Sequence, residues 1–90
     1  MLEKEIEQGL IKAVKKRGGL ALKFVSVNMN GVPDRIVILP GGLFAFIELK
    51  APGKKMRPLQ LKRKKQLEML GMKVFCIDGL DEIEEVLRAI

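Results

Sequence analysis

The sequence predicts an α/β protein in which helices pack on a mixed β-sheet. Three observations carry this prediction. Residues 2–17 have helical periodicity, two apolar runs flank a Pro-Gly-Gly turn at 40–42, and a helical segment separates the second run from a further one at 73–77. The expected order is α-β-β-β-α-β-α. Because the chain has 90 residues and no long linker, we expect one domain spanning 1–90.

The first expected helix covers residues 2–17 and ends at Gly18 and Gly19. Residues 20–27 read LALKFVSV, which favours a strand, and NMNG at 28–31 favours a turn. The apolar residues of the helix share one stripe, which consists of Leu2, Ile6, Leu10, Ala13 and Val14.

The remaining elements are a hairpin, a helix, a strand and a final helix. Residues 34–39 and 43–50 are the two strands of the hairpin. A proline suits the first turn of the helix expected over 58–70, and KVFCI (73–77) reads as a short buried strand. The final helix is expected over 78–90, with two aspartates available to cap it. The connection before 73–77 is long enough for a parallel crossover, so the sheet is expected to be mixed.

The length of the hairpin loop decides which side chains share a face. A three-residue loop, Pro40-Gly41-Gly42, places Asp34 directly opposite Glu48, whereas a two-residue loop turns Asp34 away from Glu48. We predict an odd-length loop, or a bulge with the same effect. Lys50 lies two residues beyond Glu48 and shares its face.

Two opposed carboxylates repel each other across a sheet, so something must offset the repulsion. A divalent cation is the simplest candidate, because carboxylate oxygens are ligands for Mg²⁺ and Mn²⁺. The alternative is structural. Asp34 follows a proline and could be a turn residue, while Glu48 and Lys50 could be solvent-facing residues of an amphipathic strand.

Two further polar residues border the apolar arcs of helices. Glu7 falls within the stripe of the first helix, where an unpaired acid is costly. It can reach a metal directly or through water, and a salt bridge to a nearby lysine is the alternative. Gln60 lies at the rim of the arc that Leu59, Leu67 and Leu70 form, and can point toward the end of the sheet. Arg63 falls inside that arc, and the sequence does not explain it.

Composition excludes several chemistries. The chain has no histidine, tyrosine or tryptophan, which removes histidine-ligated zinc and histidine-activated nucleophiles. The single cysteine, Cys76, lies in an apolar run and is expected to be buried. No apolar run approaches the ~18 residues of a membrane span, and the N-terminus lacks an apolar signal core, so an intracellular protein is expected.

The net charge of +6 is unevenly distributed along the chain. Positions 50–65 contain eight basic residues and no acid, a second basic cluster lies at 12–17, and acids gather at 78–85. Two basic clusters around a carboxylate site favour nucleic acid as a partner, although a solvated helix face remains the alternative for each. The eight basic residues are Lys50, Lys54, Lys55, Arg57, Lys62, Arg63, Lys64 and Lys65.

These motifs resemble the virus-type replication-repair nuclease family, VRR-NUC, of the PD-(D/E)xK nuclease superfamily. The stretches GVPDRIVILPGG, FIELKAPGKK and PLQL carry the resemblance, which covers nearly the whole chain from EKEIEQGLIKAVKKRGG onward. It implies a restriction-endonuclease-like α-β-β-β-α-β core with a mixed central sheet flanked by helices, plus a C-terminal helix. It also implies a DNA nuclease that depends on Mg²⁺ or Mn²⁺.

The resemblance further implies roles for individual residues. Asp34, Glu48 and the backbone carbonyl of Leu49 would hold the metal, and Lys50 would be the catalytic lysine. Glu7 matches the acid on the family's first helix, and Gln60 matches its glutamine after the E-x-K strand. The residues expected to contact DNA are Lys23, Lys54, Lys55, Arg57, Lys62, Lys64 and Lys65.

The chain resembles the small phage-encoded members of the family. Those look like homodimers that act on branched DNA, including four-way (Holliday) junctions, in DNA repair and related processes. A homodimeric, structure-specific endonuclease is therefore the expectation. The alternative is a basic nucleic-acid-binding module without catalysis, which explains the charge but gives no reason for Asp34, Glu48 and Lys50 to share a face.

Overall fold

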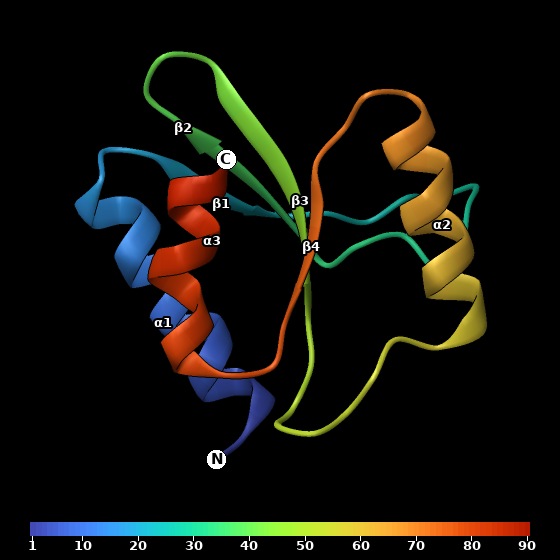
Figure 1. Cartoon of the computed structure of the whole chain (residues 1–90), viewed down its shortest axis with the longest axis horizontal. Coiled ribbons are helices and arrows are strands. Elements are labelled where there is room, and N and C mark those ends of the chain that lie inside the picture. Colours follow the sequence, from blue (N-terminus) through green and yellow to red (C-terminus); the bar gives the residue numbers. More distant parts are fainter.

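The computed structural model describes residues 1–90 and has the expected order of elements. Figure 1 shows helices on both sides of a central sheet. The elements are α1 (Glu3–Lys16), β1 (Leu20–Lys23), β2 (Arg35–Leu39), β3 (Leu43–Leu49), α2 (Pro58–Met69), β4 (Val74–Ile77), the 3-10 turn η1 (Leu80–Glu82) and α3 (Ile83–Ala89). None of these helices combines the length and the apolar character that crossing a membrane requires.

The sheet is mixed, as predicted. Its strand order is β1-β2-β3-β4, with antiparallel pairing among the first three strands and parallel pairing of β3 with β4. The connection through α2 therefore joins two parallel neighbours, which requires a crossover rather than a tight turn.

Strand β1 is shorter than the sequence suggested. It ends at Lys23, and the Phe24 N–H still donates to the Asp34 carbonyl at 2.8 Å. Beyond that bond no pairing with β2 is present, and Val25 and Val27 are 72% and 103% exposed. The β-propensity of residues 25–27 therefore has no ladder to join, and the expectation of a strand through residue 27 was wrong.

The final helix also begins later than expected. Residues 80–82 form a 3-10 turn, and the α-helix starts at Ile83. Neither aspartate caps it by a side-chain hydrogen bond; instead the Asp78 N–H donates to Glu82 Oε1 at 2.8 Å.

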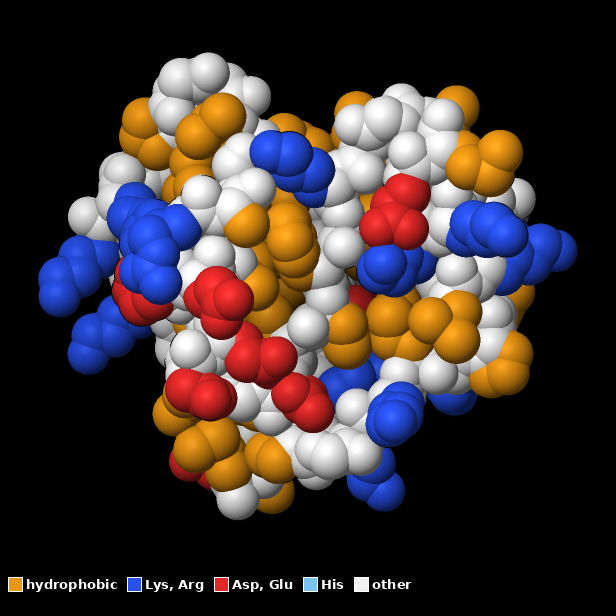
Figure 2. Space-filling view, viewed as in Figure 1, with side chains coloured by type: hydrophobic (Ala, Val, Ile, Leu, Met, Phe, Trp, Pro, Cys, Tyr) orange, Lys and Arg blue, Asp and Glu red, His pale blue; other side chains and the backbone are white.

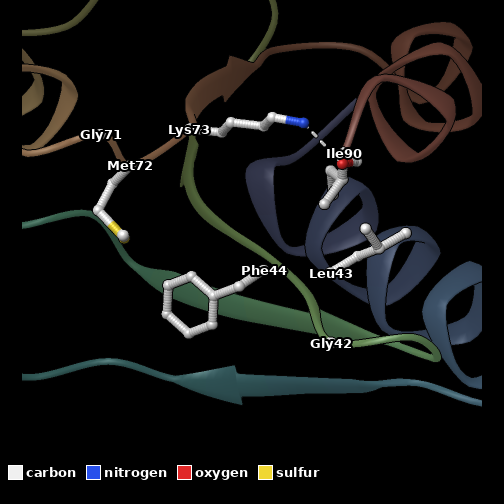
Figure 3. A pocket seen from close by; sticks show the side chains of 7 residues that line it. All are labelled: Gly42, Leu43, Phe44, Gly71, Met72, Lys73 and Ile90. Atoms are coloured by element: carbon white, nitrogen blue, oxygen red, sulfur yellow. Dashed lines mark hydrogen bonds between the residues drawn. The ribbon is translucent and has the colours of Figure 1, made fainter.

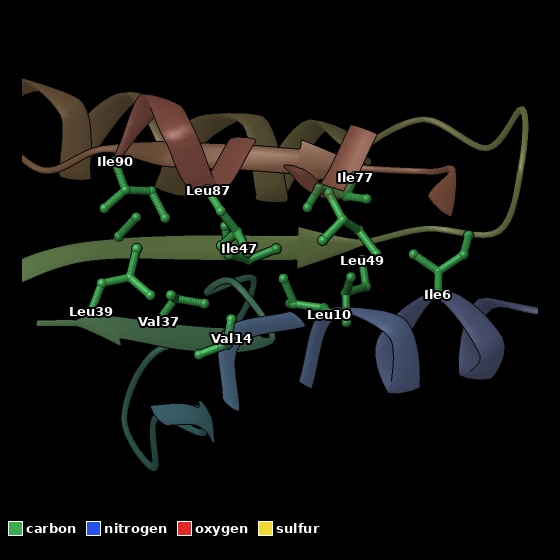
Figure 4. Packing of buried hydrophobic residues seen from close by; sticks show 12 residues of the cluster. Ile6, Leu10, Val14, Val37, Leu39, Ile47, Leu49, Ile77, Leu87 and Ile90 are labelled. Atoms are coloured by element: carbon green, nitrogen blue, oxygen red, sulfur yellow. The ribbon is translucent and has the colours of Figure 1, made fainter. Parts of the chain in front are cut away.

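The hydrophobic core lies between one face of the sheet and the helices α1 and α3 (Figure 4). Helix α1 contributes Ile6, Leu10 and Val14, which confirms most of the predicted stripe. Leu2 is 68% exposed, because it precedes the first helical residue. The sheet and the C-terminal segment supply the other core residues, which are Val37, Leu39, Ala45, Ile47, Leu49, Ile77, Ile83, Leu87 and Ile90.

Helix α2 lies on the opposite face of the sheet and buries little of itself. Gln60 is its only buried residue, while Leu59 and Leu70 are 42% and 78% exposed. The apolar arc expected on this helix is thus not a core-facing stripe. A hydrogen bond from Gln60 to Glu48 joins α2 to β3 at the end of the sheet that carries the acids.

Candidate active site

The predicted hairpin register is present. Leu39 pairs with Leu43 across a three-residue loop, and the pairs continue to Arg35 opposite Ile47. Gly41 and Gly42 adopt φ values of 89° and 77°, a left-handed conformation that glycine reaches without steric cost. The next pair in this register is Asp34 and Glu48, so the two carboxylates lie on one face at the same end of the sheet.

Asp34 is anchored to the backbone of the neighbouring strand. Its Oδ2 accepts a hydrogen bond from the Leu49 N–H at 2.8 Å. The buried Pro33 precedes it and the Phe24 N–H binds its carbonyl, so the main chain around Asp34 is held on both sides. The side chain is half-buried, which leaves it access to solvent.

Glu48 is only 1% exposed. Its Oε2 accepts a hydrogen bond from Gln60 Nε2 at 2.8 Å and lies 3.5 Å from Lys50 Nζ. Its Oε1 is buried and has no hydrogen-bond partner. A buried carboxylate oxygen without a partner is costly and calls for an explanation, and a bound cation is one.

The pKa of the Glu48 carboxyl is raised from its ordinary 4.5 to about 7. Burial is the largest cause and the charge of Asp34 is the second, while the Lys50 ammonium acts in the opposite direction. One lysine is therefore not enough to compensate two carboxylates in this position. Additional positive charge would favour the ionised form of Glu48.

Gln60 connects α2 to this acid. Pro58 begins the helix, and Gln60 Oε1 accepts the N–H of Arg57 at 2.8 Å, which fixes the amide at the first turn. The Gln60 NH₂ group then donates to Glu48. The structure thus brings together Asp34, Glu48, Lys50 and Gln60 of the residues that the sequence singled out.

Glu7 pairs with a basic residue of β2. Its Oε2 accepts a hydrogen bond from Arg35 Nη2 at 3.0 Å. Arg35 follows Asp34 in β2, so its side chain points to the opposite face of the sheet, toward α1. The partner of Glu7 is therefore an arginine, whereas the sequence suggested a metal or a lysine.

Sequence reasoning overlooked Arg35. Its side chain is 13% exposed, its Nη1 donates to the Ala21 carbonyl at 3.3 Å, and its Nε is buried without a partner. Alternation along β2 was the available signal: if Asp34 faces the site, Arg35 must face α1, where Glu7 interrupts the apolar stripe. The pair links α1, β1 and β2 at the end of the sheet where Asp34 is held.

The oxygen atoms available at the site indicate which metal ion it could bind. No group of three or more His, Cys, Asp or Glu side chains is arranged to hold a metal ion. Two carboxylates are present, with the unpartnered Oε1 of Glu48 and the Leu49 carbonyl as further oxygens near them. Mg²⁺ is commonly held by one or two carboxylates and completes its shell with water and substrate phosphates. The residues present therefore fit Mg²⁺ better than a metal that needs a complete protein cage.

Cys76 lies beside the site but is not suited to react. Its Cα pairs with that of Glu48 in the parallel ladder, and it is half-buried rather than fully buried. Burial, followed by the negative charges of Glu48 and Asp78, raises the pKa of the Cys76 thiol to about 11. A thiol in that state is a weak nucleophile and a poor metal ligand.

Most of the expected DNA-contacting residues are exposed. They lie on the loop after β3 and on the outer side of α2, and Figure 2 shows basic side chains on both sides of the molecule with acids gathered between them. Lys64 is half-buried and pairs with Glu68 at 2.8 Å. Lys23 ends β1 opposite Arg35, so it faces away from Glu48.

Two anchors hold the segments around the site. Arg63 Nε donates to the Asn30 carbonyl at 2.7 Å, which ties the loop before Pro33 to α2 and explains why an arginine occupies the apolar arc. Asp78 Oδ2 accepts the Gly53 N–H at 3.3 Å and holds the lysine-rich loop against the end of β4.

The pH dependence of stability follows from Glu48. Between about pH 4.5 and about 7 the native metal-free protein binds a proton that the unfolded chain has lost, so stability is expected to fall as the pH rises through this window. The pKa of Glu82 is also raised. The Asp78 N–H lowers it, but burial and the carboxylates of Asp78 and Asp81 outweigh that effect.

Thermal denaturation in EDTA at about pH 5 and about pH 8 checks this prediction. The Glu48→Gln variant should lose most of the pH dependence, and a Glu82→Gln variant measures the remainder. A wild-type protein that becomes more stable toward about pH 8 would contradict it.

The comparisons with known proteins agree with this geometry. No protein-family model matches the chain. The chain is 46% identical over 88 residues to "Putative nuclease p44" of Acyrthosiphon pisum secondary endosymbiont phage 1, with 98% of this chain and 94% of the phage protein covered. A solved structure described as "VRR_NUC domain" superposes with a TM-score of 0.89 at 26% identity, covering 96% and 94% of the two chains. The chain therefore belongs to the VRR-NUC family of nucleases.

Proposed function

We propose that the protein is a metal-dependent deoxyribonuclease that hydrolyses phosphodiester bonds at the site formed by Asp34, Glu48 and Lys50. The observation that carries the proposal is the state of Glu48. It is buried, its Oε1 has no partner, and its register places it opposite a second carboxylate. An acid that Lys50 compensates only in part favours a further positively charged ligand in this position.

Each residue of the site has a chemical task in this proposal. Asp34 and Glu48, with the Leu49 carbonyl, would hold Mg²⁺ or Mn²⁺, which when bound stabilises negative charge on the phosphate and makes water more acidic. Gln60 keeps the Glu48 carboxylate in one orientation through its 2.8 Å hydrogen bond. The Lys50 ammonium would orient the attacking water and stabilise the negative charge that develops on the phosphate oxygens.

The reaction is a displacement at phosphorus. A water oxygen forms a bond to phosphorus as the bond to the leaving oxygen breaks, and the water loses a proton while the leaving oxygen gains one. No histidine is needed, since Lys50 and a cation held by the two carboxylates would provide the charge stabilisation and the positioning. Glu7 would contribute by pairing with Arg35 and so steadying the strand that begins beside Asp34.

The basic residues of the loop after β3 and of α2 would hold phosphates on either side of the scissile bond. Contacts of this kind give affinity that falls with salt and carry little base readout. The chain has only four phenylalanines as aromatic residues, so extensive base stacking is not part of the proposal.

The finer proposal is a homodimer that cuts branched DNA such as four-way junctions inside the cell. A two-fold dimer presents two identical sites, which suits paired cuts on a symmetric junction. The nuclease name of the phage relative and the family of the solved structure support the activity, whereas the resemblance of the motifs supports the branched substrate.

Cleavage of three labelled DNAs, namely a linear duplex, a flap and a mobile four-way junction, tests the proposal. We expect cutting with Mg²⁺ or Mn²⁺ and none in EDTA. Asp34→Ala should lower the rate by about 10²-fold or more, because it removes a metal ligand. Asp81→Ala is the matched control, since Asp81 is an exposed acid outside the site.

The outcomes separate the two functions. Binding without cutting under every metal would leave a basic nucleic-acid-binding module on a nuclease fold. Equal cutting by Asp34→Ala and wild type would remove Asp34 from the site.

A further inference from the structure

Helix α2 carries Gln60 to the site, yet little apolar packing fixes where this helix lies. Gln60 is its only buried residue. Beyond its C-terminal end, between the hairpin and the segment that leads to β4, there is a cavity of about 460 Å³ (Figure 3). No side chain of α2 lines this cavity, which Phe44, Met72 and Lys73 help to form. Polar contacts therefore contribute much to the position of the helix.

Two side-chain hydrogen bonds connect α2 with distant parts of the chain. The first runs from Gln60 Nε2 to Glu48 Oε2 at 2.8 Å, and the second from Arg63 Nε to the Asn30 carbonyl oxygen at 2.7 Å. Gln60 and Arg63 are one turn apart, so they lie on the same face of the helix. Figure 1 shows the loop between β1 and β2, which contains Asn30, extending from the sheet to α2. The helix is thus attached at two points, one on β3 and one on this loop.

The loop touches α2 close to Arg63, but the two do not pack fully. Gly31 has a φ of 81°, and a Cβ atom there would lie 2.7 Å from Leu59 Cγ, so glycine permits this approach. Beside the contact, a cavity of about 190 Å³ remains between the loop and the helix, with Arg63 and Leu67 in its lining. Because this space is not filled, apolar packing alone does not fix the spacing of loop and helix. The hydrogen bond from Arg63 bridges the two.

The Arg63 guanidinium is engaged within the protein. The residue is half-buried, and its Nη1 donates to Gln66 Oε1 at 3.0 Å in addition to the bond from Nε. Two bonds from different nitrogens hold the planar group in one orientation. Lys62 and Lys65 on the same helix differ, because they are exposed and make no side-chain hydrogen bond. The contacts of Arg63 account for its position without a phosphate.

The loop that Arg63 holds leads directly to Asp34. Pro33 is fully buried and its ring fixes φ, so the segment from Asn30 to Asp34 is short and stiff. Asp34 Oδ2 in turn accepts the Leu49 N–H at 2.8 Å. Together with the bond from α2 to β3, these contacts close a ring that runs through α2, β3 and the loop.

We propose that Arg63 is a positioning residue of the nuclease site, which acts by fixing Asp34 relative to Glu48. It bonds to neither carboxylate, so its effect passes through the loop and the helix. Residues that support metal ligands from behind typically change activity or metal affinity by about 10- to 100-fold. The consequence for cleavage rests on the proposed function, whereas the ring of hydrogen bonds can be tested without DNA or metal.

Amide hydrogen exchange by NMR in EDTA tests the ring directly. The Leu49 N–H reports on Asp34, which accepts it, and the Arg57 N–H reports in the same way on Gln60. In Arg63→Gln we expect both amides to exchange about 10-fold faster than in wild type, at a temperature well below both melting points. Unchanged exchange of the core amides would separate this local effect from a global loss of stability. Since Arg63 is only half-buried, the variant is expected to fold, which circular dichroism checks.

Arg88→Gln is the matched control, because it removes the same charge from an exposed arginine on α3. It should leave the exchange of both amides and the cleavage rate as in wild type.

Cleavage and binding separate positioning from contact with phosphate. At saturating DNA in Mg²⁺, Arg63→Gln should lower the single-turnover rate by about 10-fold. Its DNA affinity in Ca²⁺, and the dependence of that affinity on salt, should equal those of Arg88→Gln. Lys62→Gln, which changes an exposed residue of the same helix, should instead weaken binding and reduce the salt slope by about 1.

Three results would overturn the proposal. Exchange of the two amides in Arg63→Gln at the rates of Arg88→Gln is the first, and a wild-type cleavage rate in Arg63→Gln is the second. The third is an Arg63→Gln protein with reduced affinity, a reduced salt slope and a preserved rate, because Arg63 would then contact phosphate. A wild-type protein that cuts no DNA with any metal would refute the proposed function, and the exchange rates would still decide whether Arg63 holds the ring.

Discussion

Replacing Glu48 by glutamine is expected to reduce metal-dependent DNA cleavage by about 10³-fold, because several kcal/mol of charge stabilisation in the transition state depend on this ligand. Glutamine has nearly the same shape and keeps an oxygen that can accept from Gln60. The loss would therefore come from the missing charge rather than from repacking. Single-turnover cleavage rates over a range of Mg²⁺ concentrations measure it.

The same substitution is expected to stabilise the metal-free protein at about pH 8 by about 1–3 kcal/mol, since it removes a buried charge that burial and Asp34 both disfavour. Added Mg²⁺ should raise the melting temperature of wild type and have little effect on Glu48→Gln. Activity and stability would thus move in opposite directions at one residue, as expected for an acid kept for function.

Glu68→Gln is the matched control for this experiment. It changes an exposed carboxylate on α2 that pairs with Lys64, and it should alter neither cleavage nor the response to Mg²⁺ by much. If Glu48→Gln cleaved DNA at the wild-type rate, the carboxylate would not be a metal ligand and the proposed mechanism would be wrong.

Replacing Lys50 by alanine is expected to lower the cleavage rate at saturating DNA by about 10²-fold with little change in DNA affinity. The Lys50 side chain is 14% exposed and its Nζ lies 3.5 Å from Glu48 Oε2. It is therefore too buried to act mainly by binding DNA phosphates. Its charge would act on the reacting centre instead. Single-turnover rates and binding curves, measured with the same DNA in Mg²⁺ and in Ca²⁺ respectively, separate the two effects.

Lys54→Ala is the comparison, because Lys54 lies on the same loop and is exposed. It should weaken binding slightly and reduce the dependence of affinity on salt, with the rate at saturation preserved. The opposite pattern, in which Lys50→Ala loses affinity and keeps its rate, would make Lys50 a binding residue.

Turn length and side-chain alternation were sufficient to predict the register of the hairpin and the placement of its acids. A turn of three residues and strict alternation place Asp34 opposite Glu48 and put Lys50 on the same face, and the structure has this register. The position of Gln60 in the first turn after Pro58 was equally accessible, since helix starts are signalled by proline. Alternation of side chains along β2 also places Arg35 on the face toward α1. That Arg35 pairs with Glu7 there depends on how α1 packs against the sheet.

The length of β1 was not a local property. Residues 25–27 have strand propensity, but the ladder with β2 ends before them, and Val25 and Val27 lie exposed. The apolar residues of α2 likewise indicate a buried arc, yet the only buried residue of the helix is the polar Gln60.

By itself the sequence determined the order of the elements, the hairpin register and the acids and lysine at the end of the sheet, because turn length and side-chain periodicity act over a few residues. Only the tertiary structure decided how deeply Glu48 is buried, that its Oε1 lacks a partner, and that Glu7 meets Arg35. These properties depend on how whole elements pack against one another. Burial and pairing are set by neighbours distant in the chain, which no local pattern specifies.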